Sequence, residues 1–358
     1  MPHNTGPENM PMLDVPNNHI QIGGRKSKLA VIQSEIVKAE IERHHHHLNC
    51  SVLALSTLGD KIQNKPLYSF GGKSLWTKEL EILLLEPVDE YPKLDLIVHS
   101  LKDMPTNLPD EFELGCILER EDPRDALVMK KGSPYKSLSD LPKGAVVGTS
   151  SVRRSAQLLK NYPHLRFQDV RGNIYTRLSK LDDPESPYEC LLLAAAGLIR
   201  LGLEHRIDVA LDAPEMYHAV GQGALGVEIR RDDLVVQQVL SKLEHKPSAL
   251  RCTAERSLMR ILEGGCSVPL GVSTKYDEET QQLDFKSIIV SPNGEEYVEG
   301  EVKGFVSNKA EAEEIGEQLA QILIAKGGRD ILKSINYEKI NQRPSNGSPG
   351  TAPATNAI

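Results

Sequence analysis

The stretch Leu94-Asp-Leu-Ile-Val-His-Ser-Leu-Lys-Asp-Met-Pro105 decides how the rest of the chain is organised. Its first five residues form a short apolar run with a β-branched centre, which is typical of a buried strand in an α/β sheet. The run turns polar at His99, and Pro105 cannot donate to a continuing strand. Open α/β sheets bind ligands at the carboxyl ends of parallel strands. The stretch therefore predicts a binding site, although a solvated turn capped by Asp103 explains this segment alone equally well.

Length and composition place the chain among globular proteins with several domains. Of its 358 residues, 39% are hydrophobic but only 4% aromatic, so aliphatic side chains must form most of the cores. The net charge of −8 argues against nucleic acid or an anionic membrane as a partner. The five cysteines show no zinc-like spacing, no apolar run is long enough to span a membrane, and the first residues lack a signal-peptide core. We expect a soluble, cytoplasmic monomer with reduced thiols and no metal.

The residues before the central stretch predict a strand, a glycine loop and a helix. Ile20–Ile22 is apolar, Gly23-Gly-Arg-Lys-Ser27 follows it, and apolar residues from 29 to 41 fall at helical spacing. Free amides at the N-terminus of that helix, with Arg25 and Ser27 beside them, would suit an anion.

Two further segments of this region bear on the site. Four histidines at 44–47 lie at the expected helix C-terminus, where protonatable groups suit the helix dipole, and no ligand set for a metal accompanies them. A strand is expected over 50–56. Residues 61–74, which include Lys73, are expected to form a mobile basic loop over the site or a plain flexible connection.

Arginines follow three successive strands of a second α/β region that begins after Arg124. Thr149, Ser150 and Ser151 can cap the helix after the first of these strands. Cations in a first helical turn are unfavourable, so they need a solvated face or an acidic ligand. Exposed charges contribute little to folding, so we expect these arginines to bind ligand carboxylates rather than stabilise the fold. They are Arg153, Arg154, Arg171, Arg177 and Arg200.

The last third of the chain predicts a return to the first domain and then a smaller domain. The glycine-rich segment 216–226, which contains Gln222, is expected to be a crossover that leads into a strand at 225–229. A helix from Pro247 should end at Gly264-Gly265, which would expose the thiol of Cys266. Strands are then expected over 270–276, 283–290 and 296–304, and a helix over 311–325.

These patterns predict an α/β protein with two doubly wound domains, crossover segments between them, and a small α+β third domain with an antiparallel sheet. The first domain is expected to comprise residues 19–119 and 221–243, the second 120–220 and the third 244–340. Residues 1–18 and 341–358 lack periodicity and are expected to be disordered tails.

Six motifs in this order resemble those of the porphobilinogen deaminase (hydroxymethylbilane synthase) family, most closely its fungal members. The resemblance runs from about residue 20 to about residue 340. The chain departs from many relatives at Ser69, where they have a lysine, and at Trp76, where they have a phenylalanine. The motifs are Gly24–Ser27, Val98–Pro105, Gly148–Arg154, Arg171–Asn173, Val220–Gly226 and Leu262–Pro269.

The resemblance implies a transferase that joins four porphobilinogen molecules head to tail, releases ammonia, and hydrolyses the product to hydroxymethylbilane for haem biosynthesis. It implies one dipyrromethane cofactor, held through a thioether to Cys266, and it assigns Asp103 as the catalytic carboxylate. The other cofactor-binding residues that it implies are Ser100, Lys102, Thr149, Ser151, Arg153, Arg154, Arg171 and Gly172. The substrate-binding residues that it implies are Arg25, Ser27, Lys73, Arg177, Arg200 and Gln222.

A solute receptor is the competing hypothesis. Two α/β domains with a ligand between them are also the architecture of periplasmic-binding proteins, and arginines beside helix N-termini would bind an anion there too. Fold alone does not decide between the two. The absence of a signal-peptide core and the position of Cys266 in a glycine loop favour the enzyme.

Overall fold

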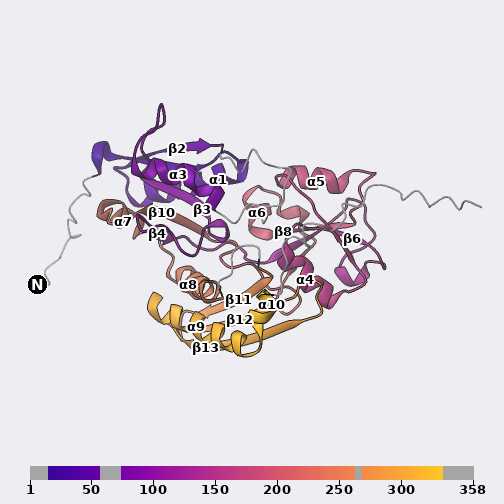
Figure 1. Ribbon diagram of the computed structural model, residues 1–358. Coiled ribbons are helices and arrows are strands. Elements are labelled where there is room, and N and C mark those ends of the chain that lie inside the picture. The colour runs from indigo at the N-terminus through magenta and orange to yellow at the C-terminus, as the bar shows by residue number, and fades with distance from the viewer. Residues whose placement is uncertain (1–14, 57–73, 263–267, 334–358) are drawn as a thin grey trace, which may run out of the picture.

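The structure is a computed structural model that describes residues 15–56, 74–262 and 268–333. It contains two β-sheets side by side, each with both parallel and antiparallel strands, and a third, antiparallel sheet lies beneath both (Figure 1). In the first, sheet A, β1 is parallel to β2 and β3, whereas β10 is antiparallel to β3 and β4. The strand order is β2 (Asn49–Leu55), β1 (His19–Arg25), β3 (Leu96–Ser100), β10 (Leu225–Arg230) and β4 (Phe112–Ile117).

The second sheet, sheet C, repeats this arrangement. Here β6 is parallel to β7 and β8, and β5 is antiparallel to β8 and β9. The strand order is β7 (Arg166–Gln168), β6 (Val146–Gly148), β8 (Cys190–Ala194), β5 (Asp125–Met129) and β9 (Val209–Leu211).

Both sheets are covered on both faces, which explains why their strands read as continuous apolar runs. In β3, Leu96 and Val98 pack with the helices α1 (Lys28–His44) and α7 (Leu234–Leu240), while Ile97 faces α3 (Ser74–Leu85). Sheet C packs against α4 (Val152–Asn161) on one face and against α5 (Ile174–Asp182) and α6 (Ala195–Arg200) on the other.

Short polar side chains cap three of these helices, and the cap by Ser151 confirms the expectation from the sequence. Ser27 accepts a hydrogen bond from the amide of Ala30, Ser151 from that of Arg154, and Asn173 from that of Thr176. Each satisfies an amide that lacks a partner within the helix. Short 3₁₀ helices complete this part of the chain: η1 (Pro16–Asn18), η3 (Leu101–Asp103), η4 (Leu138–Asp140) and η5 (Glu204–Arg206).

The third sheet has β12 (Gln282–Val290) at its centre, between β11 (Leu270–Asp277) and β13 (Tyr297–Phe305). The long helices α8 (Lys246–Ile261) and α9 (Lys309–Ala325) pack on it around the fully buried Phe285, and α10 (Gly328–Lys333) follows. Within the described ranges, no helix is long and apolar enough to cross a bilayer.

The predicted fold class is confirmed, with several corrections to its elements. The strand expected over 94–98 is β3 and continues to Ser100, because His99 is buried against Glu228 of β10 instead of starting a solvated turn. The sequence did not predict β4, β5 and β9, or the antiparallel direction of β5 and β10. Residues 61–73 of the expected loop over 61–74 and the Gly264-Gly265 helix cap lie outside the described residues.

Candidate active site

A cavity of about 740 Å³ lies between sheets A and C and reaches the third sheet. It receives the last residues of three strands: Arg25 of β1, Ser100 of β3 and Ala194 of β8. Met259 of α8 and Leu270 of β11 bound it from the third sheet. Its size suits a small-molecule ligand, and its position is the one that strand ends define in open α/β sheets.

Most of the residues predicted for the site line this cavity. Thr149 does not; it is buried, and its hydroxyl oxygen accepts a hydrogen bond from the amide of Ser151 at 3.2 Å, so it shapes the loop instead. Lys73 and Cys266 lie outside the described residues, but Val268 lines the cavity. The predicted residues that line it are Arg25, Ser27, Ser100, Lys102, Asp103, Ser151, Arg153, Arg154, Arg171, Gly172, Arg177, Arg200 and Gln222.

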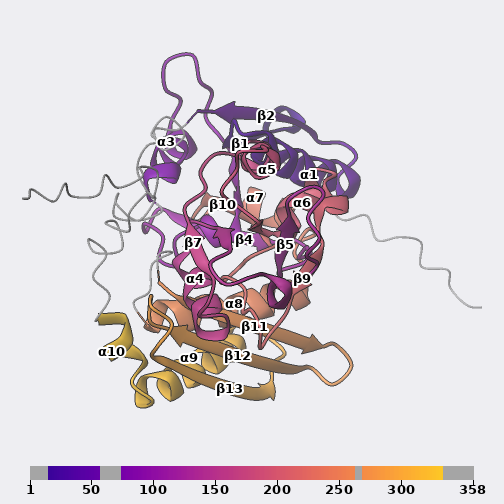
Figure 2. The same ribbon diagram turned by 90° about the vertical axis from the view of Figure 1, so that its right-hand side faces the viewer.

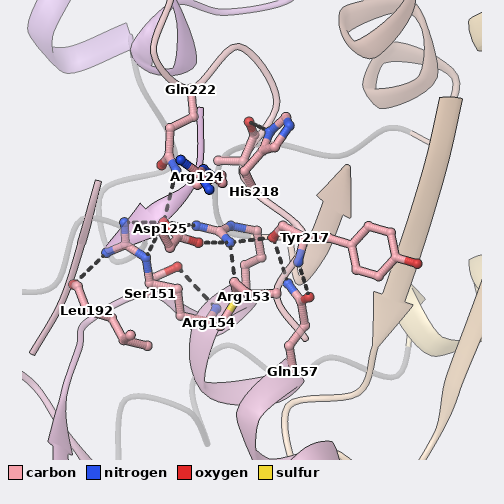
Figure 3. A network of polar contacts seen from close by, with 12 residues as sticks. Arg124, Asp125, Ser151, Arg153, Arg154, Gln157, Leu192, Tyr217, His218 and Gln222 are labelled. Carbon is pink, nitrogen blue, oxygen red and sulfur yellow. Dashed lines mark hydrogen bonds and ion pairs between the residues drawn. The ribbon is translucent and has the colours of Figure 1, made fainter. Parts of the chain in front are cut away.

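Arg153 and Arg154 converge on one buried carboxylate of the protein, Asp125 (Figure 3). Arg153 binds its two oxygens at 2.6 and 3.2 Å and donates to the carbonyl of Tyr217 at 2.6 Å; Arg154 binds one oxygen at 2.7 and 2.9 Å. Burial raises the pKa of Asp125, but the two guanidinium groups outweigh burial and hold this pKa far below its usual value. The expectation that Arg153 is an exposed charge is wrong, because only 6% of it is exposed.

Lys102 and Asp103 reach the cavity from η3, directly after β3. Lys102 donates to the side-chain oxygen of Gln222 at 3.3 Å, and Gln222 in turn donates to Asp125 at 2.9 Å. Burial, together with the charges of Arg154 and Arg153, lowers the pKa of Lys102 to about 8, although Asp103 and Asp125 oppose the shift. Asp103 is exposed and makes no hydrogen bond through its carboxylate to another described residue.

Arg171, Arg177 and Arg200 carry charges that the described parts of the chain do not neutralise by direct contact. Arg177 donates to the carbonyl of Gly172 at 2.8 Å and Arg200 to that of Gly223 at 2.7 Å, but no described carboxylate lies within 4.0 Å of any of the three guanidinium groups. Burial and the charges of Arg154 and Arg171 lower the pKa of Arg177 to about 10. These cations suit an anionic ligand.

Gly172 is needed for its conformation. Its φ is +114°, which L side chains rarely adopt, and a Cβ atom would lie 2.7 Å from the side chain of Thr176. The glycine therefore lets the backbone turn between Arg171 and the helix that carries Arg177.

Two carboxylates that support the site were missed by sequence reasoning. Asp125 is the first residue of β5, and the other four residues of that strand are apolar. A single carboxylate at the start of an apolar strand is the signal that could have identified it. Glu255 lies on the buried face of α8 and binds Arg120 at 2.7 and 3.0 Å, while accepting from the amide of Gly221 at 2.9 Å. Burial raises the pKa of Glu255, but Arg120, His218 and Thr274 together outweigh burial and bring the pKa to about 2. Glu255 therefore ties the crossover that carries Gln222 to the third sheet.

Comparisons with known proteins agree with this geometry. A family model described as the dipyromethane cofactor binding domain of porphobilinogen deaminase matches residues 20–238, and its C-terminal domain model matches 249–325. The chain is 66% identical to a porphobilinogen deaminase of Debaryomyces hansenii, covering 99% of this chain and 98% of that one. It is 65% identical to that of Candida albicans, with 92% and 96% covered. The solved methionine-binding protein MetQ overlaps 63% of this chain and 88% of its own at 12% identity, but its TM-score of 0.39 is too low to argue from.

Proposed function

Because the chain belongs to the porphobilinogen deaminase family, we propose that its cavity joins four porphobilinogen molecules head to tail, with release of ammonia, and yields hydroxymethylbilane by hydrolysis. The activity is that of a transferase of haem biosynthesis, with one dipyrromethane as cofactor. One observation carries the proposal. A protein of net charge −8 gathers Arg171, Arg177 and Arg200 at one cavity without a described carboxylate against them.

The residues of the cavity fit a covalently held dipyrromethane. Its carboxylates need cations, which Arg153, Arg154 and Lys102 supply at the edge that Asp125 organises. We propose Cys266 as the point of attachment, since Val268, two residues further on, lines the cavity. When bound, the cofactor supplies the pyrrole carbon to which the first substrate molecule is joined.

The remaining cations are proposed to bind the acidic substrate and the growing product. Arg25 ends β1 and Ser27 caps α1, and they line the same cavity as Arg177 of α5, Arg200 of α6 and Gln222. Bidentate guanidinium contacts would fix the orientation of each pyrrole carboxylate. Lys73 is proposed to contribute from the segment before α3.

Asp103 is proposed as the catalytic carboxylate. Its exposed position in the cavity places a negative charge where the substrate becomes positively charged as its amino group leaves as ammonia. A fixed charge that meets developing charge is typically the largest contribution to catalysis. The same carboxylate can assist proton transfer at the pyrrole nitrogen.

Intact mass and ammonia release test the proposal together. The purified protein should exceed its sequence mass by two linked pyrroles, and Cys266→Ser should lose that increment. Cofactor-loaded enzyme should release ammonia from porphobilinogen, whereas Asp103→Asn should release it at least about a hundredfold more slowly while folding normally. Reversible binding of porphobilinogen without ammonia release would support the anion-binding receptor instead.

The predicted domain boundaries complete the proposal. Residues 19–119 with 221–243 would form the first domain, 120–220 the second and 244–340 the third. The separate C-terminal family model, which begins at residue 249, supports the last boundary. The acidic composition and the absence of heptads support a cytoplasmic monomer without nucleic-acid or membrane partners.

A further inference from the structure

We propose that Lys28 and Tyr175 form an outer subsite at the cavity rim that captures a carboxylate of the incoming porphobilinogen. The proposal rests on the proposed function and adds to it a pair of residues that act before the inner arginines.

The pair spans the two α/β sheets. Lys28 begins α1 beside sheet A, and Tyr175 is the second residue of α5 beside sheet C. The two helices overlap in the view of Figure 2, and the contact between these residues joins their N-terminal ends. The ammonium of Lys28 donates to the phenol oxygen of Tyr175 at 3.0 Å and lies 4.7 Å from its ring centroid. Both residues line the cavity and both are exposed, Tyr175 by 38%. They therefore lie where the cavity meets solvent.

The hydrogen bond leaves this pair able to bind an anion. Because the phenol oxygen of Tyr175 accepts from Lys28, its own O–H remains available to donate, and the ammonium has two further N–H groups. A neutral phenol does not cancel the charge of Lys28, and no carboxylate in the described segments lies within 4.0 Å of this ammonium. A carboxylate beside the pair would accept hydrogen bonds from both side chains.

The position of the pair favours capture over chemistry. Lys28 follows directly after Ser27 and closely after Arg25, so a carboxylate at the rim lies next to the inner cations. Asp103 enters the same cavity from η3, on a different element. An exposed ion pair contributes little free energy, so the expected effect is on the apparent affinity for substrate, by about two- to fivefold.

The chain contains a matched control pair. The ammonium of Lys160, in α4, lies 4.3 Å from the ring centroid of Tyr297, in β13. This pair joins a helix beside sheet C to the third sheet through a lysine and an exposed tyrosine, and neither residue lines the cavity. Lys160 differs from Lys28 in lying 3.7 Å from a carboxylate oxygen of Glu299. Substitutions there repeat the loss of charge and of phenol without touching the rim.

Steady-state consumption of porphobilinogen by cofactor-loaded enzyme tests the subsite. Lys28→Met should raise KM about two- to fivefold at low ionic strength, with kcat within twofold of the parent, and added salt should shrink the difference. Tyr175→Phe should raise KM less, because it removes only the O–H donor. Lys28→Arg should restore most of the affinity, and Lys160→Met and Tyr297→Phe should leave KM unchanged.

Three outcomes would overturn the subsite: an unchanged KM in Lys28→Met, an equal rise in Lys160→Met, or a loss of kcat at constant KM, which would make the pair a structural link. Failure of the underlying function is distinguishable, since the parent enzyme would then consume no porphobilinogen at all. If the parent and control variants turn over normally and the rim variants match them, only the subsite is wrong.

Discussion

Sheets A and C have the same pattern of parallel and antiparallel neighbours, although the antiparallel strand comes last along the chain in sheet A and first in sheet C. Each sheet has a buried carboxylate on that strand, but the two carboxylates have different surroundings. Asp125 of β5 accepts hydrogen bonds from Arg153, Arg154 and Gln222. Glu228 of β10 meets His99 at 2.7 Å through one oxygen, and its other oxygen has no partner within the described segments. The same pattern of strand directions therefore holds a carboxylate with several hydrogen-bond donors in sheet C and a carboxylate with a single partner in sheet A.

The difference follows from the role of each carboxylate in the fold. Asp125 lies where cations gather at the cavity, so it neutralises part of their charge and fixes their positions. Glu228 lies opposite Ile97 in the sheet and binds His99, so it holds β3 in place just before the chain enters the cavity at Ser100. We expect the first to control stability and charge at the site, and the second mainly the position of one strand end.

Asp125→Asn should produce the largest effect. It leaves two buried guanidinium groups without their counterion, and breaking a buried ion pair costs about 3–5 kcal/mol in the free energy of unfolding. Thermal or urea unfolding would measure the loss. A variant that melts like the parent would show that the arginines do not depend on Asp125.

Arg153→Leu and Arg171→Leu should separate two kinds of arginine. Arg153 is buried against Asp125, so its loss should cost about 3 kcal/mol in the free energy of unfolding. Arg171 has no described carboxylate partner, so its loss should change stability by less than about 0.5 kcal/mol. Both should lose chain assembly, which the mass ladder of enzyme-bound intermediates records. Equal melting temperatures would contradict the distinction.

Glu228→Gln applies the same carboxylate-to-amide change to the other sheet and should cost only about 1 kcal/mol. The amide oxygen can still accept from His99, but the new N–H₂ group enters a site without an acceptor. Unfolding curves for this variant and Asp125→Asn, measured side by side, test the comparison directly. A loss as large as that in Asp125→Asn would mean that Glu228 is equally essential.

Lys102 should give the smallest effect, seen in the pH dependence of kcat/KM. Its pKa of about 8 is below the usual lysine value, so its burial as a cation costs stability below pH 8, and that cost disappears as pH rises toward the usual value. The positive charge of Lys102 favours anion binding below pH 8, and this contribution is lost as the ammonium deprotonates above pH 8. We expect kcat/KM to fall about fivefold more between pH 7 and 9 in the parent than in Lys102→Arg. Superimposable profiles would exclude this role.

Much of the fold was predictable because apolar runs and helix caps are local signals. Ser151 caps its helix as expected, and the three groups of elements follow from periodicity. Strand direction was not predictable, because β5 and β10 read like any other buried strand and their direction depends on partners far away in the chain.

The sequence predicted which cations line the candidate site, but not which carboxylates of the protein they pair with. Arg153 and Arg171 look alike in the sequence, since both come shortly after a strand and close to the start of a helix. Only the packing of β5 beside β8 brings Asp125 to one of them and not to the other. The pairing of Arg120 with Glu255 likewise joins residues 135 positions apart, which no local pattern encodes.

The placement of β10 also sets the order in which the chain can be completed during synthesis. Sheet C is one continuous stretch from Asp125 to Leu211, whereas sheet A needs β10 between β3 and β4, and β10 ends at Arg230. A chain that emerges from its N-terminus therefore has all of sheet C before the strand that joins the two halves of sheet A. Sheet A contains the first strands of the protein, but it is completed after sheet C. One edge of β3 lacks a neighbouring strand until β10, Leu225–Arg230, has been synthesised.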